Sequence, residues 1–485
     1  MNEKLKELLK TGTLGAESIK TDSNKVSRGD VFVAIRGTVH DGHDHMNEAL
    51  ASGASFVVCE HDVANLQDEI DRRKLLFCKD TREELGEVAS HIYGDPSDTL
   101  SVYGVTGTNG KTSTVFLIDS ILNKAGRPSG LVSTVFAKVR DDSVERMSLT
   151  TPDIMSLNRL LSEMVSSWKQ AAAVEISSHA LDQKRVWGIK LDSAVFTNIT
   201  PEHLDYHRDM VTYLADKSKI FDNLKPDGVG VLNQDDPMVI GLRDKIDLPH
   251  LVTFGIRENA DVRAVDIELS AEGVSFGLVT RDIGQTHVKS SFIGTHNVYN
   301  MLAAAAALVK SGLSAEDIRD GLECARPVPG RLETVDSSAP FRIFVDYAHT
   351  PNALQSVLEC LRPLARSRLI CVFGCGGDRD RTKRPVMGRT ATRIADMVII
   401  TSDNPRSEDP MSIIREIEKG VLNKTNYSII KQRQDAIREA IRAAKDGDIV
   451  VIAGKGHEDC QIIGDQVRHF DDVEVARHVL KESGY

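Results

Sequence analysis

The clearest alternation of apolar and polar segments lies in the last third of the chain. Short apolar runs rich in branched residues alternate there with segments of helical periodicity such as 411–422 and 435–445. Strands that alternate with helices are typical of crossover units in a parallel, doubly wound sheet. The predicted strands are 368–374, 396–402, 426–432 and 448–454.

Polar loops follow three of these predicted strands. Because the carboxyl ends of parallel strands meet at one edge of a sheet, where ligands bind, we expect these loops to form a site. The loops are "GCGGDRD", "SDNPRSED" and "GKGHED".

A second pattern, in the first half of the chain, is typical of a phosphate-binding loop. The predicted strand 100–105 leads into "GTNGKT", and a helical segment follows over 112–126. The usual motif has Gly five residues before the Gly of Gly-Lys-Ser/Thr, and here that position is Val105. Backbone N–H groups at the start of a helix bind phosphate, and Thr112 is placed to hold Mg²⁺. Kinases, GTPases and ligases share such loops, so the loop alone predicts only a nucleotide.

One lysine lies on the apolar face of a predicted helix over 205–224. Position 217 completes the stripe formed by Met210, Tyr213, Leu214, Ile220 and Phe221. A lysine on such a stripe usually extends its amine to solvent. If the Lys217 amine is buried, its neutral form is favoured, and a neutral amine can react with CO₂ to give a carbamate that serves as a metal ligand.

Two further predicted strands, within 171–181 and 194–207, end in potential metal ligands. They are Glu175, Ser177, Ser178 and His179 after the first strand, and His203, Asp205 and His207 after the second. Each of these residues alone is more often a helix cap or a surface residue than a metal ligand. In "TTPD" (150–153), Thr151 is expected to cap a helix that begins at Pro152.

The length, net charge and cysteine content of the chain limit the kind of protein that it can be. A chain of 485 residues is too long for one core, and turn-rich stretches at 94–99 and 325–330 divide it into 1–97, 98–328 and 329–485. A net charge of −11 disfavours a nucleic-acid partner. Seven cysteines without a CxxC pair favour reduced thiols, and neither a signal peptide nor a membrane span is apparent. We therefore expect a cytoplasmic protein without membrane insertion.

Taken in order, the motifs resemble the Mur ligase family nearly from end to end. Within it they are most similar to the members that add the third residue of the peptidoglycan stem peptide to UDP-N-acetylmuramoyl-L-alanyl-D-glutamate. The matching segments are "GTNGKT", "EISSHAL", "FTNITPEHLDYH", "YLADK", "GTHNVYN", "PGRLE", "VDYAHTP", "GCGGDRDRTKR", "DNPR" and "GKGHE".

The resemblance implies a three-domain α/β fold: a small N-terminal UDP-binding domain (1–97), a central P-loop-type ATP-binding domain (98–328) and a C-terminal doubly wound, Rossmann-like domain (329–485). It implies a monomeric, ATP-dependent ligase of peptidoglycan synthesis that uses Mg²⁺ and acts on small-molecule substrates. In the family reaction a carboxylate attacks the γ-phosphate to give an acyl phosphate, and an amine then displaces phosphate through a tetrahedral intermediate. Lys111, two Mg²⁺ ions and Arg331 would neutralise the transferring group.

The resemblance also assigns residues by role. Lys111, Glu175, His203 and Lys217 would be catalytic, and Mg²⁺ would be held by Thr112, Glu175, His203 and carbamylated Lys217. ATP would contact Gly107, Thr108, Asn109, Gly110, Lys111, Thr112, Ser113, Asn297, Asn300, Arg331, Asp346 and His349. The nucleotide-peptide substrate would contact Ser23, Thr150, Thr151, Ser177, Gln183 and Arg185, and its uridine end the segment 21–45.

The incoming amine is expected to be meso-diaminopimelate. Two guanidiniums and two acids at one sheet edge suit a ligand whose far end carries both a carboxylate and an ammonium, whereas L-lysine ends in an ammonium only. "DNPR" is also typical of the diaminopimelate-adding members, although it could be a simple proline turn. The assigned residues are Arg379, Asp403, Asn404, Pro405, Arg406, Gly454 and Glu458.

Three alternatives and two departures from the family pattern accompany this interpretation. A lysine-adding ligase and a folylpolyglutamate synthase are the alternative enzymes, and the 97 residues before the phosphate-loop strand argue against the second. A regulatory nucleotide-binding protein without catalysis is disfavoured by the intact Glu175, His203 and Lys217. The family commonly has Asp-Ser-Arg where this chain has Asp22-Ser23-Asn24, and Asp-His-Leu-Asp where it has Glu202-His203-Leu204-Asp205.

Overall fold

The computed structural model describes residues 1–485 except 38–39, 62–71, 249, 258 and 423–424. The described chain divides into two compact units, the first formed by 1–265, 278–286 and 299–324 and the second by 266–277, 287–298 and 325–485. No described helix is long and apolar enough to cross a membrane. None of the seven cysteines, which all belong to the described residues, forms a disulfide, and only Cys324 is an exposed residue.

The N-terminal part forms a four-stranded parallel sheet in the order β1-β2-β3-β4. Its strands are β1 (Ile19–Lys20), β2 (Val31–Val33), β3 (Phe56–Cys59) and β4 (Leu75–Phe77). Short helices lie between and around them, and Asp80 caps α4 by accepting bonds from two backbone N–H groups. These helices are α1 (Glu3–Lys10), η1 (Ala16–Ser18), η2 (Ser23–Lys25), η3 (Gly42–His45), α2 (Met46–Ala51), α4 (Thr81–Ile92) and α5 (Pro96–Thr99).

The central part is built on an eleven-stranded sheet in the order β15-β14-β13-β12-β11-β10-β5-β9-β6-β7-β8. The run from β12 to β6 is parallel, and this places the ends of β5, β9 and β10 next to one another at one edge. The strands are β5 (Ser101–Thr106), β6 (Ser129–Val132), β7 (Phe136–Arg140), β8 (Ser143–Arg146), β9 (Ala171–Glu175), β10 (Leu191–Phe196), β11 (Leu224–Asn233), β12 (His250–Gly255), β13 (Val262–Ser270), β14 (Gly273–Thr280) and β15 (Gly284–Ser290).

Helices of the central part connect these strands. Apolar residues of α6 and α7 are buried against the sheet, and most residues of the Ala-rich α12 are buried as well. The helices are α6 (Lys111–Lys124), α7 (Ile154–Ser166), α8 (Ser178–Asp182), α9 (Leu204–His207), α10 (Met210–Ser218), η4 (Lys219–Asn223), α11 (Pro237–Ile240), α12 (Thr295–Leu308) and α13 (Ala315–Cys324).

The helix expected over 205–224 is interrupted. It consists of α9, α10 and η4, because Arg208 adopts a left-handed φ of 69° and Asp209 then starts α10 by accepting a hydrogen bond from Thr212 N. A short polar side chain that satisfies a free N–H group favours a new helix start over a continuous helix. The apolar stripe nevertheless survives in α10.

The C-terminal part is doubly wound, as its pattern predicted. Its six-stranded sheet has the order β16-β17-β21-β18-β19-β20, parallel except for β16, and a separate hairpin pairs β22 with β23. The strands are β16 (Glu333–Thr334), β17 (Arg342–Asp346), β18 (Leu369–Phe373), β19 (Met397–Ile400), β20 (Tyr427–Ile429), β21 (Ile449–Ala453), β22 (Cys460–Ile463) and β23 (Gln466–His469).

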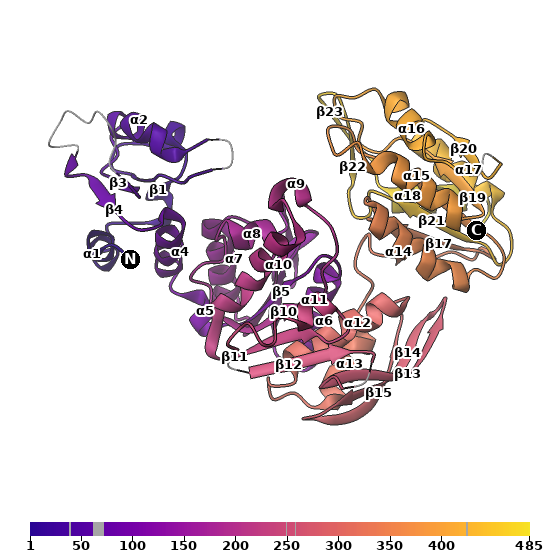
Figure 1. Ribbon diagram of the computed structural model, residues 1–485, viewed down its shortest axis with the longest axis horizontal. Helices are drawn as coiled ribbons and strands as arrows, with labels where there is room; N and C mark the ends of the chain where they lie inside the picture. The colour runs from indigo at the N-terminus through magenta and orange to yellow at the C-terminus, as the bar shows by residue number, and fades with distance from the viewer. Residues whose placement is uncertain (38–39, 62–71, 249, 258, 423–424) are drawn as a thin grey trace. The chain divides into compact units, whose positions relative to one another are not determined.

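Alternate residues of each central strand enter different cores, which is why β18 and β21 are apolar throughout. Leu369, Cys371 and Phe373 pack with α14, α15 and α16, whereas Ile370 and Val372 pack with α17 and α18 on the other face (Figure 1). The helices are α14 (Pro351–Leu361), η5 (Arg362–Leu364), α15 (Lys383–Ile394), α16 (Pro410–Glu418), α17 (Arg433–Ala443) and α18 (Asp472–Glu482).

Candidate functional site

The predicted phosphate loop joins β5 to the start of α6, which begins at Lys111. Two of its glycines are required by close approaches as well as by positive φ angles. A Cβ at Gly107, where φ is 144°, would lie 1.9 Å from Thr197 Oγ1, and one at Gly110, where φ is 86°, would lie 2.2 Å from Asn300 Oδ1. The loop therefore presents bare backbone at a helix start, with Asn300 beside Gly110.

Two lysines share one carbonyl of this loop. Lys111 Nζ donates to Gly107 O at 3.0 Å and to Thr108 O at 2.9 Å, and Lys217 Nζ donates to Gly107 O at 2.7 Å. Lys217 is 1% exposed, so its amine is buried and does not extend to solvent as a lysine on an apolar stripe usually does. Burial, and then the neighbouring charge of Lys111, lower the pKa of Lys217 well below its ordinary value. Its amine is thus biased towards the neutral, nucleophilic form.

A buried carboxylate lies beside the start of α6. Glu175 ends β9, and its Oε2 accepts from Thr112 Oγ1 at 3.1 Å and from Thr134 N at 3.0 Å. Hydroxyl and carboxylate oxygens are the ligand types that Mg²⁺ prefers, so this pair fits the ion.

His203 is exposed, has a left-handed φ of 55°, and meets His179 edge to face at 4.9 Å. The described residues contain no group of three or more His, Cys, Asp or Glu side chains arranged to hold a metal ion.

The sequence placed His207 among potential metal ligands, but its side chain is buried between α8 and α10. Its Nδ1 lies 2.8 Å from Asp216 Oδ2, and its Nε2 lies 2.9 Å from Ser178 Oγ, with all three residues buried. Both ring nitrogens are therefore occupied, and His207 ties α8 to α10 rather than offering a nitrogen to a metal. This contact helps to position Lys217, which follows Asp216 on α10.

Most of the residues predicted to contact the nucleotide-peptide substrate lie together. Thr151 Oγ1 donates to Glu175 O at 2.8 Å and accepts from Ser177 N at 3.0 Å, while Arg185 Nη1 donates to Thr151 O at 3.1 Å. Gln183 Oε1 accepts from Arg185 Nε at 3.0 Å.

Thr150 belongs to the same group of contacts, because its hydroxyl lies 3.1 Å from that of Thr134. The expected helix-capping role of Thr151 is wrong: α7 is capped by Asp153, whose side chain accepts from Ser156 N, and Pro152 precedes the helix. Thr151 instead joins the end of β9 to the start of α8.

Ser23 lies apart from that group, in the N-terminal sheet region, where its hydroxyl donates to Glu48 Oε2 at 2.9 Å. Asn24 bonds back to Asp22, whose side chain accepts from Asn24 N. Of the segment 21–45 expected at the uridine, residues 38–39 lie outside the described part of the chain.

The remaining predicted ATP contacts belong to the second compact unit. Arg331 stacks over the Tyr347 ring at 4.8 Å, and its buried Nε has no hydrogen-bond partner among the described residues. Asp346 accepts from Leu332 N and Ala348 N at 2.8 Å each, and burial raises the pKa of its carboxyl.

Two further predicted ATP contacts lie within hydrogen-bond distance of nearby backbone carbonyls. Asn297 donates its amide to Ile293 O at 2.9 Å. The His349 ring nitrogen Nδ1 lies 2.9 Å from Tyr347 O.

The two predicted arginines at the C-terminal sheet edge lie beside one glycine. A Cβ at Gly376 would lie 2.9 Å from Arg406 Nη1 and 3.9 Å from Arg379 Cγ. Arg406 Nη1 also donates to Gly377 O at 2.9 Å. The loop after β18 and the loop after β19 are thus held together, and a Cβ at Gly377 would lie 1.9 Å from Pro405 O.

An ion pair between Glu408 and Arg384 supports the same loops. Glu408 accepts from Asp378 N at 2.7 Å and from both terminal nitrogens of the buried Arg384. The Arg384 hydrogen bonds lower the pKa of Glu408 to about 2.

The acidic members of the predicted diaminopimelate site lie at the same edge. Asn404 Nδ2 donates to Glu458 Oε2 at 2.8 Å, and Asn404 N donates to Asp403 Oδ1 at 2.6 Å. A Cβ at Gly454, where φ is 122°, would lie 2.7 Å from Asp403 Oδ2. Only a glycine at position 454 therefore leaves room for the Asp403 carboxylate.

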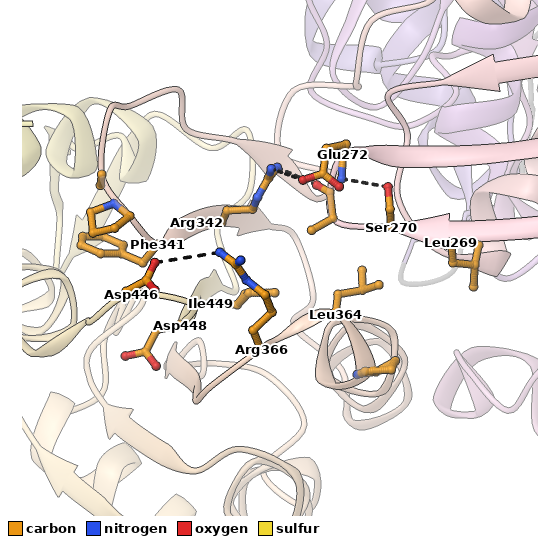
Figure 2. Close-up of a pocket in the computed structure, with 15 residues that line it drawn as sticks. Leu269, Ser270, Glu272, Phe341, Arg342, Leu364, Arg366, Asp446, Asp448 and Ile449 are labelled. Atoms are coloured by element: carbon orange, nitrogen blue, oxygen red, sulfur yellow. Dashed lines mark hydrogen bonds and ion pairs between the residues drawn. The ribbon is translucent and has the colours of Figure 1, made fainter.

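A hollow of about 530 Å³ lies at the opposite edge of the C-terminal sheet, near the amino ends of β17 and β21. Figure 2 shows Arg342 directed at Glu272, and Arg366 at Asp446, across its wall. The predicted ligand loops follow the carboxyl ends of these strands, so this hollow is separate from them.

Comparison with known proteins agrees with the order of the motifs. Residues 16–93 match the Mur ligase family catalytic domain, residues 105–308 the Mur ligase middle domain, and residues 330–456 the Mur ligase glutamate ligase domain. A UDP-N-acetylmuramoyl-L-alanyl-D-glutamate–2,6-diaminopimelate ligase of Geobacillus kaustophilus (strain HTA426) is 44% identical over 475 residues, covering 96% of this chain and 95% of the relative. The chain belongs to the Mur ligase family.

Two further relatives carry the same name. The protein of Bacillus velezensis (strain DSM 23117 / BGSC 10A6 / LMG 26770 / FZB42) is 43% identical, with 96% of this chain and 94% of the relative covered. A solved structure with that name has a TM-score of 0.70 at 32% identity, covering 97% of this Mur ligase and 95% of that chain. The three-domain α/β fold implied by the motifs is therefore confirmed.

Two buried cations lie under the C-terminal loops of this Mur ligase, and neither was predicted from the sequence. Lys455 is 0% exposed, and Arg433 is 1% exposed and pairs with Asp472 through bonds of 2.7 and 2.6 Å. Lys455 stands between two glycines after a buried strand, a pattern that resembles the Gly-Lys of the phosphate loop. Arg433 had no comparable signal.

Proposed function

We propose that this Mur ligase adds meso-diaminopimelate to UDP-N-acetylmuramoyl-L-alanyl-D-glutamate with ATP, as an acid–amino-acid ligase of peptidoglycan synthesis. The observation that carries the proposal is the C-terminal loop cluster, in which Arg379 and Arg406 border Gly376 while Asp403, Asn404 and Glu458 lie at the same sheet edge. Guanidiniums bind a carboxylate, and carboxylates bind an ammonium, so the cluster suits an amino-acid centre at the far end of the amine substrate. The names of the relatives support the same choice.

The reaction proceeds in two steps. A carboxylate oxygen of the dipeptide attacks the γ-phosphorus and ADP leaves, which gives an acyl phosphate. The amine of diaminopimelate then attacks the acyl carbon, the tetrahedral intermediate expels inorganic phosphate, and the amine loses a proton. Backbone N–H groups from Gly107 to Ser113 and the amine of Lys111 stabilise the charge on the transferred phosphoryl group.

Mg²⁺ would be held by Thr112 and Glu175, with His203 and a carbamate on Lys217 as further ligands, and it would neutralise phosphate charge. The buried amine of Lys217 supports the carbamate, because its lowered pKa leaves a neutral nitrogen that can add to CO₂ with loss of a proton. ¹³C NMR after addition of ¹³C-bicarbonate tests this step: a carbamate carbon signal is expected in the wild type and not in Lys217→Met. The same signal in the variant would contradict the assignment.

The other substrate contacts are proposed by role. ATP would contact Gly107, Thr108, Asn109, Gly110, Lys111, Thr112, Ser113, Asn297, Asn300, Arg331, Asp346 and His349. The UDP-muramoyl-dipeptide would contact Ser23, Thr150, Thr151, Ser177, Gln183 and Arg185, and diaminopimelate would contact Arg379, Asp403, Asn404, Pro405, Arg406, Gly454 and Glu458. The mutual hydrogen bonds of Thr151, Ser177 and Arg185 support the second group.

We also propose a cytoplasmic, monomeric protein with domains at 1–97, 98–328 and 329–485. The absence of a disulfide among the seven described cysteines supports a reducing compartment. Analytical ultracentrifugation of the full chain checks the oligomeric state.

An amino-acid panel tests the proposed reaction. Phosphate release is measured with ATP, UDP-N-acetylmuramoyl-L-alanyl-D-glutamate and one candidate amine at a time, and the product is identified by mass spectrometry. We expect meso-diaminopimelate to give the highest kcat/KM, with L-lysine far lower. Preferential use of L-lysine would favour the lysine-adding alternative, and turnover of a folate with glutamate would favour a folylpolyglutamate synthase.

A further inference from the structure

Lys455 lies under the C-terminal loop cluster with its entire side chain buried. It follows β21, and its Nζ donates to Asn404 Oδ1 at 3.2 Å, to Glu458 Oε2 at 3.3 Å and to Cys460 O at 2.5 Å. An ammonium has three donors, so this set of acceptors satisfies it completely. Burying an ammonium is costly unless such partners are present, which makes the cation a specific feature of this position.

The Lys455 contacts fix the orientation of the Asn404 amide. Its Oδ1 accepts from both Lys455 Nζ and Ile462 N, the latter at 3.1 Å, so its Nδ2 is directed to Glu458 Oε2. A flipped amide would place an NH₂ group against two donors. Glu458 Oε2 is consequently held by two donors, whereas Glu458 Oε1 makes no hydrogen bond with the described protein.

Lys455 also sets the sign of the charge at this cluster. The charged residues assigned to the amine site are Arg379, Arg406, Asp403 and Glu458, which sum to 2 − 2 = 0, and Lys455 adds one positive charge to give +1 for this set. The neighbouring Arg433 is matched by Asp472 and leaves this sum unchanged. A distal centre that carries a carboxylate and an ammonium is neutral overall, whereas the distal end of L-lysine carries a single positive charge. A positive cluster repels the second ligand more than the first.

We propose that Lys455 is a positioning and specificity-determining residue, which orients Asn404 and Glu458 and biases the cluster against amines that lack a distal carboxylate. This inference rests on the proposed function. It assigns Lys455 no contact with the substrate, because the side chain acts through the two residues to which it is hydrogen-bonded. Removing its charge should therefore change the choice of amine more than the use of ATP.

The experiment compares Lys455→Met and Lys455→Gln with the wild type as full-length proteins. For each, kcat/KM is measured for meso-diaminopimelate and for L-lysine, and KM is measured for ATP. We expect the diaminopimelate-to-lysine ratio of kcat/KM to fall by about tenfold or more, the size of one charge-assisted hydrogen bond, while KM for ATP changes by less than about twofold. Lys169→Met is the matched control, because Lys169 is also buried and pairs with Asp141 in the other compact unit.

Glu458→Gln provides a test that does not depend on the folding of a Lys455 variant, since the Glu458 side chain is 32% exposed. It raises the cluster charge to +2, so the diaminopimelate-to-lysine ratio should rise even though kcat/KM falls for both amines. A ratio that falls in Glu458→Gln would overturn the inference. So would an unchanged ratio in a Lys455 variant whose circular dichroism and Tm match those of Lys169→Met. If the wild type itself does not use diaminopimelate, the proposed function fails instead.

Discussion

Truncation of Arg406 gives the sharpest test of the proposed amine site. Arg406 has a left-handed φ of 51°, and its backbone is held on both sides, by Arg406 N to Ile462 O at 3.1 Å and Gly464 N to Arg406 O at 2.8 Å. Arg406→Ala should therefore remove the guanidinium while leaving the loop backbone in place.

The size of the effect follows from the contact that is lost. A hydrogen bond to a charged group contributes about 1.5–3 kcal/mol. Since each 1.4 kcal/mol corresponds to about a factor of ten, KM for diaminopimelate should rise about 10- to 150-fold. Arg406 Nη1 also holds Gly377 O at 2.9 Å, and freeing that buried carbonyl should lower the Tm slightly.

Initial rates of phosphate release measure the effect, with diaminopimelate varied at saturating ATP and UDP-muramoyl-dipeptide. KM for ATP should stay within about twofold, because the phosphate loop is untouched. Arg381→Ala is the matched control: the side chain of Arg381 is 60% exposed and pairs with Glu416, so little change is expected. An unchanged KM for diaminopimelate in folded Arg406→Ala would refute the assignment of the amine site.

Three further substitutions test other parts of the structure. Gly107→Ala should abolish binding of a nonhydrolysable ATP analogue, because its Cβ would lie 1.9 Å from Thr197 Oγ1, and wild-type affinity in a titration would contradict this. Asp472→Asn should lower the free energy of unfolding by about 3–5 kcal/mol, because it leaves Arg433 buried beside a neutral partner. Urea unfolding that shows no loss of stability would be inconsistent with the pairing. The pKa of Glu408 is about 2 in the folded protein, against an ordinary value of 4.5. Between these two pH values the unfolded chain binds more protons than the folded protein does. The stabilisation that Glu408 provides is therefore lost as the pH falls through that range. Unfolding of Glu408→Gln at about pH 3 and about pH 6 should therefore show a smaller pH dependence than that of the wild type, and an identical dependence would rule out Glu408 as its source.

The features that the sequence predicted well are those set by local periodicity. The apolar runs around β18 and β21 are buried on both faces, and such runs indicate parallel strands wherever helices alternate with them. The place of Lys217 on an apolar stripe was also visible in the sequence, but its burial was not, because a lysine there usually extends its amine to solvent.

Features that depend on tertiary partners were not predictable from local sequence. Thr151 has the sequence context of a helix cap, yet the backbone of Glu175 and Ser177 takes its hydroxyl. The burial of Lys455 depends on Asn404, which precedes it by 51 residues. No periodic pattern marks a cation whose partners come from another loop.

The exposed thiol of Cys324 offers a practical handle for measuring motion. Cys324 ends α13, and the next residue begins the last chain segment of the second compact unit. Brief maleimide treatment should attach a fluorophore there before the less accessible sulfurs react, without any engineered cysteine. Time-resolved anisotropy of that dye, recorded as nucleotide and amine are added in turn, would follow the connecting segment through a catalytic cycle.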